Sequence, residues 1–189
     1  PSVSAPAIPA GVIRKQGLCS ALIAYVDGFI GADGGTVEDT RPRAAAAVEV
    51  LTDFGFLMNQ VKQNLNMETR LVALGSLLNT GDMVVELPEK RVAKFLATAG
   101  EVRAHHQNVT ARDVAKVVGQ ILACQLSHGL VCKLRSRYLT RCLIPASSAR
   151  NYSVRVAVQG RALAELDFWI ETLRTIAPRP MQSHTRRAD

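Results

Sequence analysis

Two stretches of the chain have the pattern of β-hairpins, in which apolar runs flank a short turn. In the first, apolar residues between positions 18 and 31 lie on both sides of Asp27 and Gly28. This pattern predicts a strand, a tight turn that carries Asp27, and a second strand, with Gly28 supplying an unusual backbone angle. In the second stretch, the runs 70–78 and 83–87 flank the turn-forming sequence Asn-Thr-Gly-Asp. Each stretch therefore predicts one antiparallel pair of strands.

Apolar residues that recur at helical spacing predict a series of helices. One helix is expected over residues 37–54 and another over about 130–143. Three more are expected to begin at Pro88, at 110–113 and near Gln159. Thr36 and Thr110 are each followed three residues later by a carboxylate, which is the capping-box pattern. Gly55 is a natural helix-ending glycine, and Pro145 is expected to stop the 130–143 helix. The apolar side of that helix is expected to carry Leu130, Leu134, Tyr138 and Leu139.

Together these elements predict an α+β fold, with a small antiparallel sheet backed by the helix at 37–54 and a helical part after it. A chain of 189 residues with 48% hydrophobic residues is long and apolar enough to form a buried core. The expected divisions are a flexible lead at 1–13, a sheet-containing subdomain at 14–87, a helical subdomain at 88–150, a weakly extended segment with a terminal helix at 151–176, and a flexible basic tail at 177–189.

The charged residues of the chain are unevenly distributed. From Val114 to Ala164 the sequence contains no Asp or Glu, whereas the rest of the chain mixes both signs. A surface that carries only positive charge attracts a polyanion, because binding neutralises phosphates and releases their counterions. We therefore predict that this segment binds nucleic acid. The candidate binding residues are Lys116, Lys133, Arg135, Arg137, Arg141, Arg150, Arg155 and Arg161.

The cysteines and the hydropathy of the chain bear on its location. The four cysteines are widely spaced and form no Cys-x-x-Cys pair, which favours reduced thiols in an intracellular protein over zinc ligands or disulfides. No apolar run reaches the length of about 18 residues that a membrane-spanning helix needs. We therefore expect an intracellular protein without a membrane anchor, and the sequence leaves nucleus, organelle and cytoplasm open.

The first hairpin carries a motif. Its sequence Tyr25-Val26-Asp27-Gly28 is similar to the Tyr-x-Asp-Asp turn of reverse transcriptases, with glycine in place of the second aspartate. Later landmarks follow in the same order, and over residues 14–174 the chain resembles the C-terminal half of a retroelement polymerase of the DIRS type. The segments that carry this resemblance are 54–62, 74–88, 109–121, 134–139 and 162–169.

The resemblance implies that 14–87 is a palm-like subdomain, 88–150 a thumb-like subdomain and 151–176 a connection-like segment. It also implies that the first catalytic carboxylate lies before residue 1 and a ribonuclease H domain after residue 176. Such polymerases hold two divalent ions between carboxylates. Gly28 cannot ligate a metal through a side chain, and Asp27, even with Asp33 nearby, leaves too few oxygen ligands for magnesium. Asp27 is thus a remnant of the metal-ligand position.

These observations favour a non-catalytic module that binds structured RNA or an RNA–DNA hybrid, without a cofactor, among other protein subunits of a ribonucleoprotein. One alternative is a fragment of an active RNA-directed DNA polymerase completed by other segments, in which Asp27 would bind magnesium. A second alternative is a protein–protein scaffold whose basic face docks an acidic partner. A shortened palm would also leave strand edges that a partner must cover.

Overall fold

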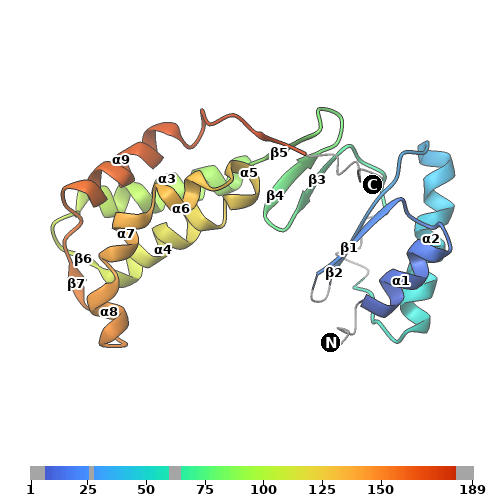
Figure 1. Ribbon diagram of the computed structural model, residues 1–189, viewed down its shortest axis with the longest axis horizontal. Helices are drawn as coiled ribbons and strands as arrows, with labels where there is room; N and C mark the ends of the chain where they lie inside the picture. The colour runs from blue at the N-terminus through green and yellow to red at the C-terminus, as the bar shows by residue number, and fades with distance from the viewer. Residues whose placement is uncertain (1–6, 26–27, 60–64, 182–189) are drawn as a thin grey trace, which may run out of the picture. The chain divides into compact units, whose positions relative to one another are not determined.

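The computed structural model describes residues 7–25, 28–59 and 65–181 (Figure 1). The chain separates into two compact units, Pro1–Glu68 and Thr69–Asp189, and each has its own hydrophobic core. This boundary differs from the expected one, since residues 70–87 belong to the second unit rather than to the hairpin near the N-terminus. The architecture is α+β. No helix in the described ranges is both long enough and apolar enough to cross a membrane.

Unit 1 consists of a β-hairpin packed with two helices (Figure 1). Its elements are α1 (Ala7–Lys15), β1 (Ala21–Tyr25), β2 (Gly28–Ala32) and α2 (Val37–Asp53). Strands β1 and β2 pair antiparallel, from Ala21 opposite Ala32 to Tyr25 opposite Gly28, which confirms the expected hairpin. Asp27, the predicted metal-ligand remnant, lies outside the described residues.

Helix α1 contradicts the expected flexible lead over residues 7–13. Ile13 is fully buried and Ala10 nearly so, and both share a core with Leu22 and Leu51. Burial of such side chains stabilises a short helix that its own propensity would not hold. The sequence around α1 did not reveal the helix, because the apolar partners lie on β1 and α2.

Helix α2 begins and ends where the sequence predicted. The Asp39 backbone N–H donates to Thr36 Oγ1 (3.2 Å), and the Thr36 hydroxyl donates to the Asp39 carboxylate (2.6 Å). At the other end Gly55 has a φ of +82°. Its N–H bonds to the carbonyl of Thr52 (2.8 Å), and the next N–H, of Phe56, bonds to that of Leu51 (3.0 Å). These two bonds form a Schellman motif, which favours glycine at this position.

Unit 2 begins with a sheet that also includes a segment near the end of the chain. Its described strands are β3 (Arg70–Ala73), β4 (Ser76–Asn79), β5 (Val84–Glu86) and β8 (Arg179–Pro180), all antiparallel and in that order. The β4–β5 pair confirms the expected hairpin. The run 70–78 is not one strand, because it turns at Leu74 and Gly75, which have positive φ angles of 51° and 74°.

Strand β8 contradicts the expected flexible tail for residues 179–180. Arg179 lies opposite Val85 and Pro180 opposite Val84, and the Met181 N–H donates to the Met83 carbonyl (2.7 Å). The tail is therefore held as the edge strand of the sheet. Residues 182–189 lie outside the described part of the chain.

The rest of unit 2 is helical, with a short pair of strands (Figure 1). Its elements are α3 (Glu89–Ala104), β6 (Val109–Thr110), α4 (Ala111–Leu122), α5 (Gln125–His128), α6 (Val131–Leu134), α7 (Arg137–Arg141), α8 (Ile144–Ser148), β7 (Arg155–Val156) and α9 (Arg161–Thr172). Helices α3, α4 and α9 supply most of the core, which includes the fully buried Trp169. The predicted starts of α3 and α4 are confirmed, with Pro88 and Thr110 as the N-cap residues.

The single helix expected over 130–143 is instead two short helices, α6 and α7, that break at Arg135 and Ser136. Three tertiary hydrogen bonds hold the break. The indole N–H of Trp169 donates to the Arg135 carbonyl (2.6 Å), and the backbone N–H groups of Tyr138 and Leu139 donate to Glu165 Oε2 (2.8 and 3.0 Å). Helix α9 thus sets the direction of α7.

The break changes which side chains are buried. Leu139 is fully buried as expected, but Leu130 and Leu134 are 67% and 68% exposed, so the predicted apolar side does not exist as one surface. Pro145 also differs from expectation. It lies in the first turn of α8, where a missing N–H costs nothing, and does not stop a helix.

Candidate nucleic-acid interface

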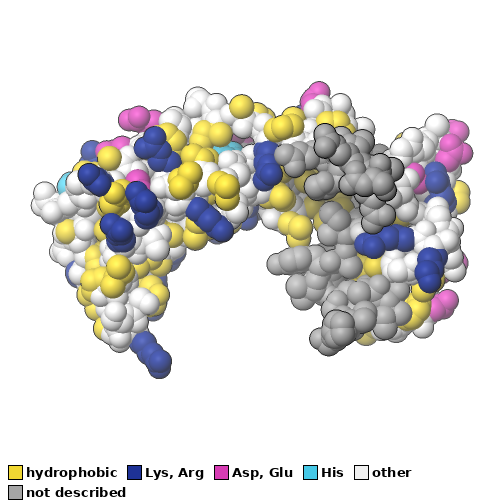
Figure 2. All heavy atoms as spheres, in the orientation of Figure 1, with side chains coloured by type: hydrophobic (Ala, Val, Ile, Leu, Met, Phe, Trp, Pro, Cys, Tyr) yellow, Lys and Arg dark blue, Asp and Glu magenta, His cyan; other side chains and the backbone are white. Residues whose placement is uncertain are grey.

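Four of the predicted binding residues come together on α7, on the start of α9 and on the residue after α6. We refer to Arg135, Arg137, Arg141 and Arg161 as the arginine cluster. Figure 2 shows Lys and Arg side chains gathered over the region of α6, α7 and α9. The four residues are all exposed. Among the described residues, no carboxylate lies within ion-pair distance of any of them.

Tyr138 is the centre of this cluster. The guanidinium carbons of Arg137, Arg141 and Arg161 lie 5.1, 5.3 and 5.3 Å from the centroid of its ring. At these distances the ring quadrupole attracts each cation. Arg161 Nη1 also donates to the Tyr138 hydroxyl (2.6 Å). This hydrogen bond, together with the positive charges nearby, lowers the pKa of the Tyr138 phenol below its usual value.

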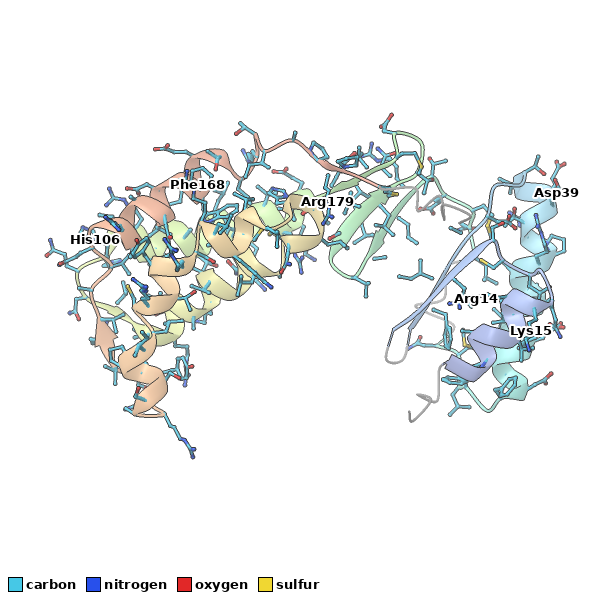
Figure 3. All side chains as sticks on the ribbon, viewed as in Figure 1. Arg14, Lys15, Asp39, His106, Phe168 and Arg179 are labelled. Atoms are coloured by element: carbon cyan, nitrogen blue, oxygen red, sulfur yellow. The ribbon has the colours of Figure 1, made fainter. Side chains whose placement is uncertain are left out.

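A second aromatic ring holds the remaining arginine. Phe168 lies on α9 (Figure 3), and the guanidinium carbon of Arg135 is 4.9 Å from its ring centroid. Phe168 in turn contacts Trp169 edge to face, with ring centroids 5.3 Å apart. Each arginine of the cluster contacts an aromatic ring, and this contact favours the side-chain position seen in the structure. Its N–H groups keep their capacity to bind an anion.

The cluster borders a surface hollow of about 420 Å³. The hollow is lined by Arg135, Arg137, Arg161, Tyr138, Glu165, Leu134 and Ala164. Glu165 is only 6% exposed, and its carboxylate is engaged by the two backbone N–H groups at the start of α7. The hollow therefore combines three guanidinium groups with the Tyr138 side chain, one structural carboxylate and two apolar side chains.

The other four predicted residues do not share the aromatic contacts of the cluster. Lys116 on α4 forms an ion pair with Asp113 (2.9 Å), and Arg155 on β7 donates to the Asn108 carbonyl (3.0 Å). Lys133 is exposed on α6, and Arg150 follows α8. Arg155 also acts on Asp113, whose pKa is lowered mainly by its hydrogen bond from Thr110. The acid-free stretch of sequence is therefore not one continuous basic surface.

The acidic residues near the first hairpin do not assemble a metal site in the described part of the chain. Asp33 accepts a hydrogen bond from Ser20 Oγ (2.7 Å) and forms an ion pair with Arg43 (2.9 Å). Its carboxylate therefore joins the hairpin to α2. Across the described ranges, no group of three or more His, Cys, Asp or Glu side chains is placed to hold a metal ion.

Sequence reasoning missed the aromatic side chains that the arginines contact. Tyr138 was expected on an apolar helix face, and Phe168 falls in the helix expected to begin near Gln159. Arg141, three residues after Tyr138, is a local signal, because side chains three residues apart lie on the same side of a helical turn. No local signal indicated that Arg161 and Glu165 would contact α7, because α9 is distant from α7 in the sequence.

No protein-family model, curated protein or solved structure matches this chain. The resemblance to reverse transcriptases therefore remains a prediction from the order of motifs. Function has to be inferred from the charge and geometry of the arginine cluster.

Proposed function

We propose that this chain is a non-catalytic nucleic-acid-binding module that holds the backbone of structured RNA or of an RNA–DNA hybrid. In this proposal the module descends from a reverse transcriptase and works with other protein subunits in a ribonucleoprotein. The observation that carries the binding role is the arginine cluster. Its four exposed guanidinium groups contact aromatic rings and, within the described residues, have no carboxylate partner.

Phosphate is the ligand that suits these side chains best. A guanidinium group presents N–H donors in a planar fork that matches two phosphate oxygens. Several like charges held close together repel one another, and a polyanion relieves that repulsion. Phosphate contacts of this kind position a protein on a nucleic acid without reading its sequence.

The aromatic rings of the cluster favour duplex over single-stranded ligands. Proteins that bind single strands stack bases on open aromatic faces. Here Tyr138 has three guanidinium groups around its ring and Phe168 has one. Bases would have to displace them to stack. Recognition of an A-form backbone by shape and phosphate contact needs no such displacement.

Gly28 and Asp33 support the non-catalytic part of the proposal. Gly28 stands where a reverse transcriptase carries its second turn aspartate, and a glycine offers no side-chain ligand. Asp33, the other acid near the hairpin, is engaged by Ser20 and Arg43. Magnesium-dependent extension of a primer by the chain would contradict this part of the proposal.

The experiment is a salt series of binding to duplex RNA, RNA–DNA hybrid and duplex DNA. The test variant replaces Arg135, Arg137 and Arg141 by glutamine. The control variant makes the same change at Arg70, Arg103 and Arg174, which are paired with Glu86, Asp167 and Glu89. Both variants lose three positive charges, so the change in net charge is the same. They differ in where the charge is removed and in the ion pairs that the control variant breaks.

We expect the wild-type chain to bind the A-form duplexes most tightly. The test variant should weaken binding and reduce the slope of log K against log salt by about 2–3, since each phosphate contact contributes about 0.9. The control variant should change the slope much less. Equal effects of the two variants would mean that overall charge, and not the arginine cluster, drives binding.

A further inference from the structure

The hollow beside the arginine cluster carries more positive charge than one internal phosphate of a nucleic acid can neutralise. Arg135, Arg137 and Arg161 line it with three positive charges, and Glu165 contributes one negative charge. The lining therefore has two positive charges in excess. An internal phosphodiester carries one negative charge, whereas a phosphate monoester carries about 1.5 to 2 at pH 7.

The three arginines that line the hollow contact aromatic rings on two helices, Tyr138 on α7 and Phe168 on α9. Arg161 on α9 is fixed by its hydrogen bond to the Tyr138 hydroxyl (2.6 Å). Arg137 on α7 lies over the same ring, and Arg135 lies over Phe168. Because these contacts favour one position of each side chain, an anion that binds between them costs less conformational entropy than one that binds free arginines.

The size of the hollow indicates more than a bare phosphate. Its volume of about 420 Å³ falls within the range of about 300–1,000 Å³ that is typical of small-ligand sites. Leu134 and Ala164 give it apolar walls beside the guanidinium groups. A nucleotide that ends a strand has this combination, with a dianionic phosphate and a less polar sugar and base.

We propose that this hollow binds the terminal phosphate monoester of a nucleic-acid strand. The inference rests on the proposed function for the strand itself, and adds that the end of the strand is recognised. Arg137 and Arg161 contact the phosphate oxygens, and Arg135 closes the hollow against Phe168. The rest of the arginine cluster, Arg141, contacts the adjoining backbone.

The test compares one RNA duplex prepared with hydroxyl groups at both ends, with a 5′-phosphate or with a 3′-phosphate. A fourth duplex carries the methyl ester of the preferred phosphate, which keeps the tetrahedral phosphate, adds one methyl group and has a single charge. Variants Arg137→Gln and Arg161→Gln remove lining cations. Lys133→Gln is the control, since Lys133 is exposed on α6 and does not line the hollow.

We expect one phosphorylated end to bind about tenfold more tightly than the hydroxyl end, the effect of one additional charge-assisted hydrogen bond. The methyl ester should lose most of this preference. Arg137→Gln and Arg161→Gln should abolish it, while Lys133→Gln should weaken all duplexes alike. A wild-type chain that binds all ends equally would overturn the inference. So would a preference that survives both arginine variants.

A second measurement separates this inference from the proposed function. Adenosine 5′-monophosphate, adenosine 3′-monophosphate and adenosine are titrated into the chain, with the fluorescence of Trp169 and nuclear magnetic resonance shifts as readouts. If no duplex binds but either monophosphate does, the proposed function fails and the phosphate site stands. If neither duplexes nor monophosphates bind, both fail.

Discussion

Glu165 gives the sharpest test of the structure, because a buried carboxylate determines where one helix ends and the next begins. Its Oε2 atom accepts the backbone N–H groups of Tyr138 and Leu139 at 2.8 and 3.0 Å. We consider the substitutions Glu165→Gln and Glu165→Ala. The first keeps the shape and an oxygen acceptor but removes the charge, and the second removes the acceptor altogether.

The expected magnitudes follow from these two hydrogen bonds. A hydrogen bond to a charged group contributes about 1.5–3 kcal/mol and is about twice as strong as a neutral one. Gln also avoids the desolvation that the buried carboxylate suffers, so we expect Glu165→Gln to lower the free energy of unfolding by about 1–2 kcal/mol. Glu165→Ala leaves two N–H groups without a partner and should cost about 3–5 kcal/mol.

Urea unfolding followed by tryptophan fluorescence measures this effect in unit 2 alone. Trp169 is the single tryptophan of the chain, and its indole bonds to the same break between α6 and α7. With a slope of about 2 kcal/mol/M, Glu165→Gln should lower the midpoint by about 0.5–1 M. Glu171→Gln, an exposed position on the same helix, is the matched control. Equal midpoints for the two Gln variants would refute the role given to Glu165.

Further predictions concern the backbone, pH and thiol reactivity. Gly129→Ala should lower stability by about 1–3 kcal/mol, because the residue has φ 72° and ψ −150°, whereas Gly119→Ala inside α4 should raise it by up to about 1 kcal/mol. The hydrogen bond from Thr110 holds the pKa of the Asp113 carboxyl below 3.8. The stability that this carboxylate contributes to the folded chain is therefore complete above pH 3.8 and is lost as the pH falls through the lowered pKa. The stability difference between wild type and Asp113→Asn should therefore shrink in acid. Burial raises the pKa of the Cys132 thiol to about 11, so iodoacetamide at pH 8 should label it only after unfolding.

Each of these has a measurement that can contradict it. Urea midpoints of Gly129→Ala and Gly119→Ala that move in the same direction would conflict with the backbone angles. A stability difference for Asp113→Asn that is constant between pH 6 and pH 3 would remove the hydrogen bond with Thr110 as its cause. Mass spectrometry that finds Cys132 labelled as fast in the folded chain as in urea would show that the thiol is accessible.

Elements with signals in their own sequence were predictable. The capping boxes at Thr36 and Thr110 placed the starts of α2 and α4, and Gly55 placed the end of α2. Each of these signals acts within a few residues, through hydrogen bonds of one helical turn. The hairpins at β1–β2 and β4–β5 were visible for the same reason, since a turn between apolar runs defines them.

Elements decided by distant residues were not predictable. The break between α6 and α7 depends on Trp169 and Glu165, which lie on α9. Helix α1 depends on burial against Leu51. The candidate site also combines a local and a distant part. The acid-free stretch of sequence pointed to the arginines, but Arg161 reaches Tyr138 only through the packing of α9 on α7.

Strand β8 has a consequence for how unit 2 folds. Its pairing joins Arg179 to Val85, residues about 90 positions apart, so the sheet is completed only when the two ends of unit 2 meet. Closing so long a loop is entropically costly, and contacts of this kind slow folding. During that interval β5 is an open strand edge, which can pair with another chain. Truncation before residue 179 would make that intermediate permanent, and we expect such a chain to aggregate during refolding at concentrations where the full chain does not.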